Sequence, residues 1–391
     1  MSDRPAIQRV AVVAHDAGGA RALVPVVHEL RRRGLEIHPI LAGPALKIWR
    51  EELSRRVAGM EDKTPLPVLK AMLKRWRVDA LLSAAGLYNL IEHRTRIAAR
   101  GLGLPVVALL DSWFNYRERF ERRPAGRTVF SPADKVCVID SLTRREMLKA
   151  GFGKTQIVLT GHPDMEQTVN ACRAVSENRR RALRRAAGIP QTGMVITFIS
   201  DPFYIAPGLK FYSGPGAIMR PNGAGIFGYT VREILPVVLE ELETALANEK
   251  IRATLVVRPH PSEHEEAVSR ILRGTRLKSL RTQLIRRGTL AGWIQISDAV
   301  LGMMSIALLQ AALSGRPAIS VEIGLRGSGR EDPCMSNTLG YTRGIFDRRE
   351  LRRVCRLIAR HDWDALKPRP KHPLPFASAT KRVVEVLLGG G

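Results

Sequence analysis

The sequence predicts an α/β protein made of two doubly wound domains, each with a parallel sheet. Short apolar runs alternate with segments that have apolar residues at helical spacing, as in strands joined by helices. Most of these runs end in Gly, Pro or polar residues, which marks the carboxyl end of a strand. The polar, arginine-rich segment 164–190 interrupts the alternation once, so that two series of elements result.

The first series occupies residues 1–163. Its first strand is expected at 10–13, and the helix after it carries Leu23, Val26, Val27 and Leu30 on one face before Gly34 stops it. Further strands are expected at 37–41, 79–83, 106–110, 136–139 and 157–160. This series predicts an N-terminal Rossmann-like domain.

The second series occupies residues 191–366. Strands are expected at 195–199, 255–257, 299–301 and 318–321, with a helix at 230–246 and a long Gly- and Pro-containing loop at 200–228. Segment 164–190 is the expected linker. Residues 367–391 begin with several prolines and continue into a helix-like stretch, 377–388, which we expect to cross back to the N-terminal domain. The two domains are expected to face each other across a cleft.

The chain is strongly basic, with 62 Lys and Arg against 37 Asp and Glu and a formal charge of +25. Solvated helix faces, an anionic substrate and an anionic membrane surface all fit this excess. Nucleic acid does not, because aromatic residues are few, do not interleave with the basic runs, and form no recognition motif. We expect the charge to gather on one face of the N-terminal domain, around Arg31, Arg32, Arg33, Arg94, Arg96, Arg117, Arg119, Arg122 and Arg123.

Cysteine usage and hydropathy favour a cytoplasmic protein. The four cysteines are scattered without a CxxC pair, which argues against a zinc site or a disulfide framework. The N-terminus lacks the features of a signal peptide, and the longest apolar stretch, 299–313, is too short to span a membrane. Attachment to the inner face of a membrane through the basic residues is a further expectation.

Polar residues follow the strands of the second domain, where α/β sheets bind their ligands. Arg258 and His260 come after the strand at 255–257 and are suited to phosphate, as a guanidinium fork and a hydrogen-bond donor. Ser305 opens a helix, where a hydroxyl and free N–H groups bind phosphate, and Glu322 is placed to bond a ribose. The alternatives are a simple strand end for Arg258 and His260, a helix cap for Ser305 and a surface charge for Glu322.

The first domain carries candidate catalytic residues at its strand ends. His15 and Asp16 follow the first strand, and Gly18 and Gly19 would let a phosphate approach the backbone at the helix N-terminus. Asp111 follows the strand at 106–110. An enzyme that deprotonates an acceptor hydroxyl needs a general base, and these three side chains are the candidates. Alternatively, Asp16 and Asp111 cap helices, and the nearby Trp113 and Tyr116 are core residues instead of stacking against a sugar or lipid.

These motifs resemble those of the GT-B glycosyltransferase superfamily. The strand ending in His260-Pro261, the Ser305 position and the small–apolar–Gly–Pro pattern at 307–317 are similar to the C-terminal halves of bacterial polysaccharide transferases. The relatives implied are CDP-glycerol glycerophosphotransferases, sialyltransferases, Kdo transferases and non-hydrolysing UDP-sugar 2-epimerases. Gly161-His162-Pro163-Asp164 resembles the turn that closes their first domain. The epimerase segment after the Ser position is replaced by Met303-Met304-Ser305-Ile306.

The resemblance implies a transferase that takes a sugar or polyol phosphate from a nucleotide-activated donor. The acceptor would be an envelope polysaccharide or a lipid-linked glycan. The nucleotide sugar is then a substrate, and neither a cofactor nor a metal is expected. Two alternatives remain open: a 2-epimerase that alters a UDP-sugar without an acceptor, and a non-catalytic scaffold of the same fold that docks on membranes.

Overall fold

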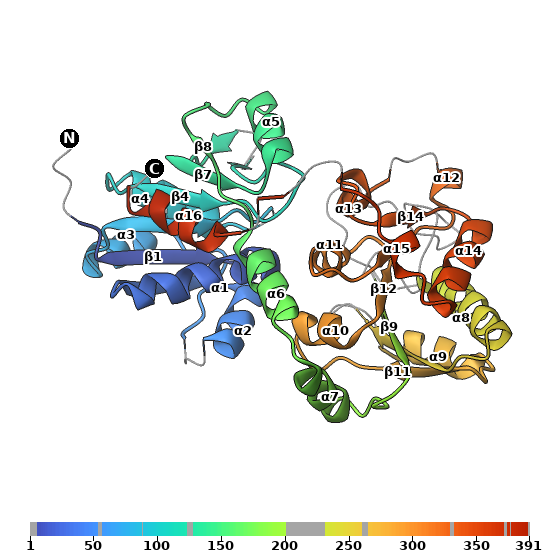
Figure 1. Ribbon diagram of the computed structural model, residues 1–391. Helices are drawn as coiled ribbons and strands as arrows, with labels where there is room; N and C mark the ends of the chain where they lie inside the picture. The colour runs from blue at the N-terminus through green and yellow to red at the C-terminus, as the bar shows by residue number, and fades with distance from the viewer. Residues whose placement is uncertain are drawn as a thin grey trace. The chain divides into compact units, whose positions relative to one another are not determined.

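The computed structural model describes residues 6–53, 57–87, 89–122, 128–200, 231–259, 265–328, 332–370, 374–375 and 377–389. These residues form two compact units, Met1–Gln167 with Leu374–Gly391, and Thr168–Pro373 (Figure 1). Each unit contains one six-stranded parallel sheet. The prediction of an α/β architecture with parallel sheets is therefore confirmed.

The sheet of the first unit has the strand order β2-β1-β3-β4-β7-β8. All six expected strands are present, as β1 (Arg9–Ala14), β2 (Glu36–Leu41), β3 (Ala80–Ala84), β4 (Val106–Leu109), β7 (Lys135–Val138) and β8 (Ile157–Leu159). A short antiparallel ribbon, β5 (Glu121–Arg122) and β6 (Val129–Phe130), was not expected.

Both faces of this sheet are buried, which explains why its strands are continuously apolar. Val10 and Val12 of β1 pack on one face with α1 (Ala17–Arg32), α2 (Gly43–Glu52) and α16 (Ala379–Leu387). Ala11 and Val13 point to the other face, towards α3 (Leu66–Arg75), α4 (Ile91–Arg100) and α5 (Ser141–Lys149). The C-terminal helix α16 thus belongs to the core of the first unit, and the backbone N–H of its Thr380 donates to Glu166 over 2.9 Å.

The sheet of the second unit has the order β11-β10-β9-β12-β13-β14. Four expected strands are present, as β9 (Met194–Ile199), β10 (Ala253–Arg258), β12 (Ala299–Gly302) and β13 (Ala318–Val321). The two edge strands, β11 (Leu280–Leu284) and β14 (Arg343–Ile345), were missed. Their sequences are polar or very short, so they lack the apolar run on which strand prediction depends.

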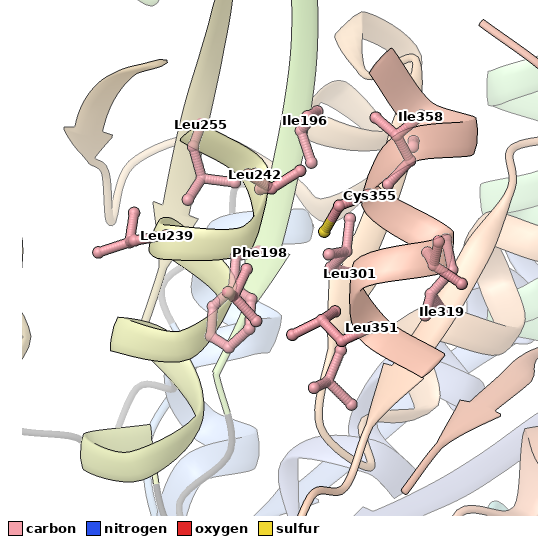
Figure 2. Packing of buried hydrophobic residues seen from close by; sticks show 14 of the residues in the cluster. Ile196, Phe198, Leu239, Leu242, Leu255, Leu301, Ile319, Leu351, Cys355 and Ile358 are labelled. Carbon is pink, nitrogen blue, oxygen red and sulfur yellow. The ribbon is translucent and has the colours of Figure 1, made fainter. Parts of the chain in front are cut away.

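The main core of the second unit lies between this sheet and two helices, α8 (Val231–Asn248) and α14 (Arg348–Ala359). Figure 2 shows Leu239 and Leu242 of α8 and Leu351 of α14 beside Phe198 of β9. The opposite face is covered by α7 (Glu177–Ala186), α10 (Leu290–Ile296) and α11 (Ile306–Leu313). Within the described residues, the other helices of this unit are α9 (Glu265–Gly274), α12 (Leu325–Ser328), α13 (Met335–Thr338) and α15 (Trp363–Leu366).

The segment expected as a linker, 164–190, is mostly helical. It holds most of α6 (Pro163–Arg173) and all of α7, and the division between the two units falls within α6. Two arginines of α7 attach this helix to the sheet of the second unit. Arg180 and Arg184 both form ion pairs with Asp298, just before β12, at 2.5 and 3.5 Å.

The basic residues are not gathered on the first unit, contrary to expectation. That unit carries 30 basic and 19 acidic residues, and the second carries 32 and 18. Arg96 and Arg119, which we expected on an exposed face, are buried at 0 and 7% exposure. Both guanidinium groups donate to internal backbone carbonyls, which replace the water they lose.

All four cysteines are buried and free. None of the helices in the described ranges is both long and apolar enough to cross a membrane.

Candidate functional site

Both sheets reverse their strand order at one point, and α/β proteins bind ligands at the carboxyl edge beside such a point. In the first unit the reversal lies between β1 and β3, which are direct neighbours. His15 and Asp16 leave the end of β1, and Ala85 and Gly86 leave the end of β3. Asp111 follows β4, which pairs with β3 on the far side. The three candidate catalytic residues of the sequence therefore share one sheet edge.

His15 and Asp16 form a pair. The imidazole Nδ1 lies 2.7 Å from the Asp16 Oδ1, and the two side chains are 23 and 41% exposed. The hydrogen bond that His15 makes to the Asp16 carboxylate raises the pKa of His15 above 6.5, although burial opposes the rise. Burial works against ionisation of Asp16 as well, but the hydrogen bond and charge of His15 outweigh it and lower the pKa of this carboxyl. Asp16 occupies the N-cap position of α1 without making a side-chain cap bond, so the capping alternative does not account for it.

Asp111 pairs with Arg119. The guanidinium Nη1 lies 3.1 Å from Asp111 Oδ1, and the two side chains are 12 and 8% exposed. The same nitrogen donates to the carbonyl of Ala85 over 2.6 Å, and Nε donates to that of Phe114 over 2.9 Å. Arg119 thus joins the loops that follow β3 and β4. No helix begins at Asp111, so it is not a helix cap.

The aromatic residues after Asp111 divide between core and surface. Trp113 is buried, and its Nε1 donates to Asp140 over 2.7 Å. Burial raises the pKa of Tyr116 to about 12, and its ring packs against the core. The core alternative is therefore correct for both residues. Phe114, which the sequence reasoning did not single out, is 48% exposed on this loop.

Close packing at this edge requires glycine. A Cβ added to Gly18 would lie 2.3 Å from Asp111 Oδ2, and one added to Gly86 would lie 2.3 Å from Asp16 Oδ2. A Cβ on Gly19 would lie 2.7 Å from that of Ala84. Contacts this short do not occur, so each glycine makes room for a neighbour within the chain. Binding of phosphate by Gly18 and Gly19 stays a prediction.

A residue that the sequence reasoning missed lies beneath these loops. Glu92, in the first turn of α4, is fully buried, and its carboxylate accepts hydrogen bonds from the backbone N–H groups of His15 and Gly86. Burial and the nearby charge of Asp16 raise the pKa of Glu92. Its sequence context, IEHRTRIAAR, is rich in charged residues and typical of a solvated helix. The pattern therefore does not identify Glu92 as a buried residue.

The second unit carries the predicted phosphate ligands. Arg258 is the last residue of β10 and is half-buried, and its carbonyl accepts from the N–H of Ser200 over 3.1 Å. His260 lies outside the described residues. Ser305 follows β12, at the reversal between β9 and β12, and its hydroxyl accepts from Ala307 N over 3.3 Å. The cap alternative is correct for Ser305, and a cap position also leaves helix N–H groups available to an anion.

Glu322 is fully buried, unlike the surface charge considered for it. Its Oε1 accepts from the hydroxyl of Ser320 and from the amide of Asn337, the latter over 3.0 Å. Asn337 also donates to Asp332 over 3.0 Å and to Ser320 over 2.8 Å. Glu322 is thus one member of an internal network, and a contact with ribose stays a prediction.

A cavity of about 650 Å³ opens beside the edge strand β11. None of the predicted site residues within the described ranges lines it. Its walls include Leu183, Ala187, Gln283, Ile285, Arg287 and Trp293. In the part of the chain that the structure describes, no group of three or more His, Cys, Asp or Glu side chains is arranged to hold a metal ion.

No protein-family model and no curated protein matches the sequence. Solved structures do match along almost the whole chain. The UDP-GlcNAc 2-epimerase of Methanocaldococcus jannaschii has a TM-score of 0.67 at 12% identity, covering 98% of this chain and 100% of its own. That of Neisseria meningitidis, bound to UDP-GlcNAc, has a TM-score of 0.67 at 13% identity with the same coverage.

The Anabaena protein HepE, in complex with UDP and glucose, has a TM-score of 0.53 at 12% identity, covering 97% of this chain and 95% of its own. At these identities the likeness concerns the fold. The two-domain GT-B-like fold predicted from the sequence is confirmed.

Proposed function

We propose that this protein is an enzyme that acts on a nucleotide-activated sugar, as a UDP-sugar 2-epimerase does. The observation that carries the proposal is the set of proton-transfer groups at the strand reversal of the first sheet. The His15–Asp16 pair and Asp111 lie on neighbouring loops and remain partly open to solvent. The fold shared with two UDP-GlcNAc 2-epimerases supports this choice of reaction.

Acid–base groups of this kind suit an epimerisation. Epimerisation by proton transfer uses one group to remove the proton of the C–H bond and another to return a proton to the opposite face. The composition of the sugar is unchanged, so the reaction consumes no acceptor. His15 has a pKa above 6.5, which allows it to hold or release a proton near neutral pH. Asp111 supplies the second group, oriented by Arg119.

We assign the nucleotide phosphates to the second unit. Arg258 ends β10 and offers a guanidinium to phosphate oxygens, and Ser305 begins α11 at the strand reversal. His260 is the third proposed ligand. Basic side chains and helix N–H groups of this kind stabilise a diphosphate by electrostatics alone.

A glycosyltransferase is the second candidate. It is favoured by the sequence Met303-Met304-Ser305-Ile306, which departs from the segment found in epimerases, and by the fold shared with HepE, solved with UDP and glucose. In that case His15, Asp16 or Asp111 would deprotonate an acceptor hydroxyl of a glycan or lipid-linked substrate at an anionic membrane surface.

Calorimetry and product analysis together test the proposal. Titration with UDP, GDP, CDP and CMP, free and linked to sugars, should show binding of at least one nucleotide sugar. The bound donor is then incubated with the protein alone. Conversion to an isomeric nucleotide sugar supports the epimerase, whereas consumption only after addition of a glycan acceptor supports the transferase. A folded protein that binds none of the nucleotides contradicts both and supports the non-catalytic scaffold.

A further inference from the structure

Glu92 is a carboxylic acid in the interior of the first unit, where the ionised form of the side chain loses its hydration. Its side chain has 0% exposure, and removal of an ionised group from water is strongly unfavourable unless hydrogen bonds replace the water. Both oxygens are used: Oε1 accepts from the N–H of His15 over 2.8 Å, and Oε2 accepts from the N–H of Gly86 over 2.6 Å. A glutamine of the same size has one acceptor oxygen and an NH2 donor, so it could not accept both bonds.

The two hydrogen bonds join Glu92 to the loops that follow β1 and β3, the two strands at the reversal. His15 is the first residue after β1, and Gly86 is the second residue after β3. Gly86 also lies against Asp16, since a Cβ at this position would meet the Asp16 carboxylate. Glu92 therefore bridges the two loops through their backbone, next to the hydrogen bond that the Leu87 N–H makes to the Asp16 carboxylate.

Helix α4 holds Glu92 firmly. The N–H groups of Leu90 and Ile91 donate to Asp62 Oδ1 over 2.7 and 3.0 Å, so a residue from another segment caps the helix. One turn further on, the buried Arg96 donates to Ser83 Oγ over 3.0 Å and to the carbonyl of Arg119 over 2.9 Å. One turn beyond Glu92, α4 is thus fixed both to β3 and to the loop that carries Asp111.

We propose that Glu92 is the positioning residue of the site, which aligns the His15–Asp16 pair by holding the β1–α1 and β3–α4 loops together through their backbone N–H groups. The effect of Glu92 on catalysis rests on the function proposed above. Glu92 does not contact the substrate; it acts through His15 and Gly86.

The charges around His15 give this role a measurable consequence. The carboxylates that face the imidazole are Asp16, Asp62 and Glu92, and all three raise its pKa. Arg119 faces Asp16. Burial and the charge of Asp16 raise the pKa of Glu92, and Arg96, which faces Glu92, opposes that rise. Loss of the Glu92 charge should therefore lower the pKa of His15 towards 6.5, even though the two side chains make no direct hydrogen bond.

The test compares Glu92→Gln with Thr95→Val. Thr95 lies on the same helix, is equally buried, and bonds only within the helix, to the carbonyl of Ile91 over 2.6 Å. In NMR titrations of the folded proteins, E92Q should lower the pKa of His15, and T95V should leave it unchanged. With a nucleotide sugar as substrate, E92Q should reduce kcat about 10-fold to 100-fold with little change in KM. The acidic limb of its pH–rate profile should move to lower pH.

Two results would overturn the proposal. One is an E92Q protein that folds and has the wild-type His15 titration and kcat. The other needs no variant: hydrogen exchange of the wild-type protein should show protected amides at His15 and Gly86, and free exchange at both contradicts the proposed bonds. If no nucleotide sugar is converted by the wild type, the proposed function fails, while the titration and exchange results still decide the role of Glu92.

Discussion

The two sheets present different chemistry at equivalent places. At the strand reversal of the first sheet lie two titratable side chains, His15 and Asp16, with Asp111 one strand away. At the reversal of the second sheet lies a helix cap, Ser305, with Arg258 on the neighbouring strand. The acid of the second sheet, Glu322, is turned inward and fully buried. We infer that proton transfer belongs to the first unit and anion binding to the second.

The largest effect is expected from Asp111→Asn in the first unit. Loss of a general acid or base typically lowers the rate 100-fold to 10,000-fold, so kcat should fall by about 1,000-fold. Asp134→Asn is the matched control, because Asp134 serves the opposite end of the same strand by accepting from Val106 N over 2.8 Å. Steady-state kinetics should show a rate close to wild type for D134N, and equal losses in both variants would refute the special role of Asp111.

Arg258→Ala should weaken the binding of UDP without changing the proton-transfer groups of the first unit. A hydrogen bond to a charged group contributes about 1.5–3 kcal/mol, so the affinity for UDP should fall about 10-fold to 100-fold. Arg252→Ala, just before the amino end of β10, is the control and should bind UDP normally. Calorimetry measures both. The His15 titration should be the same in R258A as in wild type, and a shift there would argue against separate roles for the two units.

Glu322→Ala tests whether this buried acid is structural. Removing it leaves the Ser320 hydroxyl without its acceptor, which should cost about 1–3 kcal/mol of unfolding free energy. Glu322→Gln keeps one acceptor oxygen and should recover part of that loss. Chemical denaturation measures the stability of each variant. UDP affinity should be unchanged in E322Q, and a large loss there would instead support the contact with ribose.

Asp16→Asn should lower the free energy of unfolding by a small amount that depends on pH. The raised pKa of His15 means that the pair stabilises the fold at low pH and loses this effect as pH rises through that pKa. The lowered pKa of Asp16 means that its contribution is present above about 3.8 and is lost as pH falls. The destabilisation by D16N should therefore be largest near pH 5. It should stay below about 1 kcal/mol, because both side chains are partly exposed. Denaturation at pH 5 and pH 8 gives the comparison, and equal losses at both would contradict the pairing.

The fold was largely predictable, because buried parallel strands leave continuous apolar runs such as those of β1 and β9. The edge strands β11 and β14 were not, since an edge strand needs little apolar sequence. The catalytic candidates His15, Asp16 and Asp111 were found because they follow strands directly. Glu92 was not found, because only the packing of α4 against two loops distinguishes a buried acid from a solvated one. For the same reason, burial of Arg96 and Arg119 could not be read from their basic surroundings.

We infer that the first unit carries out proton transfer on the sugar of a bound nucleotide. Proton NMR of UDP-GlcNAc incubated with the protein in D2O, without any acceptor, tests it most directly. We expect deuterium to replace the hydrogen at the inverted carbon and signals of a second, isomeric nucleotide sugar to appear. A protein that binds UDP-GlcNAc but leaves its spectrum unchanged throughout the incubation would contradict proton transfer by the first unit.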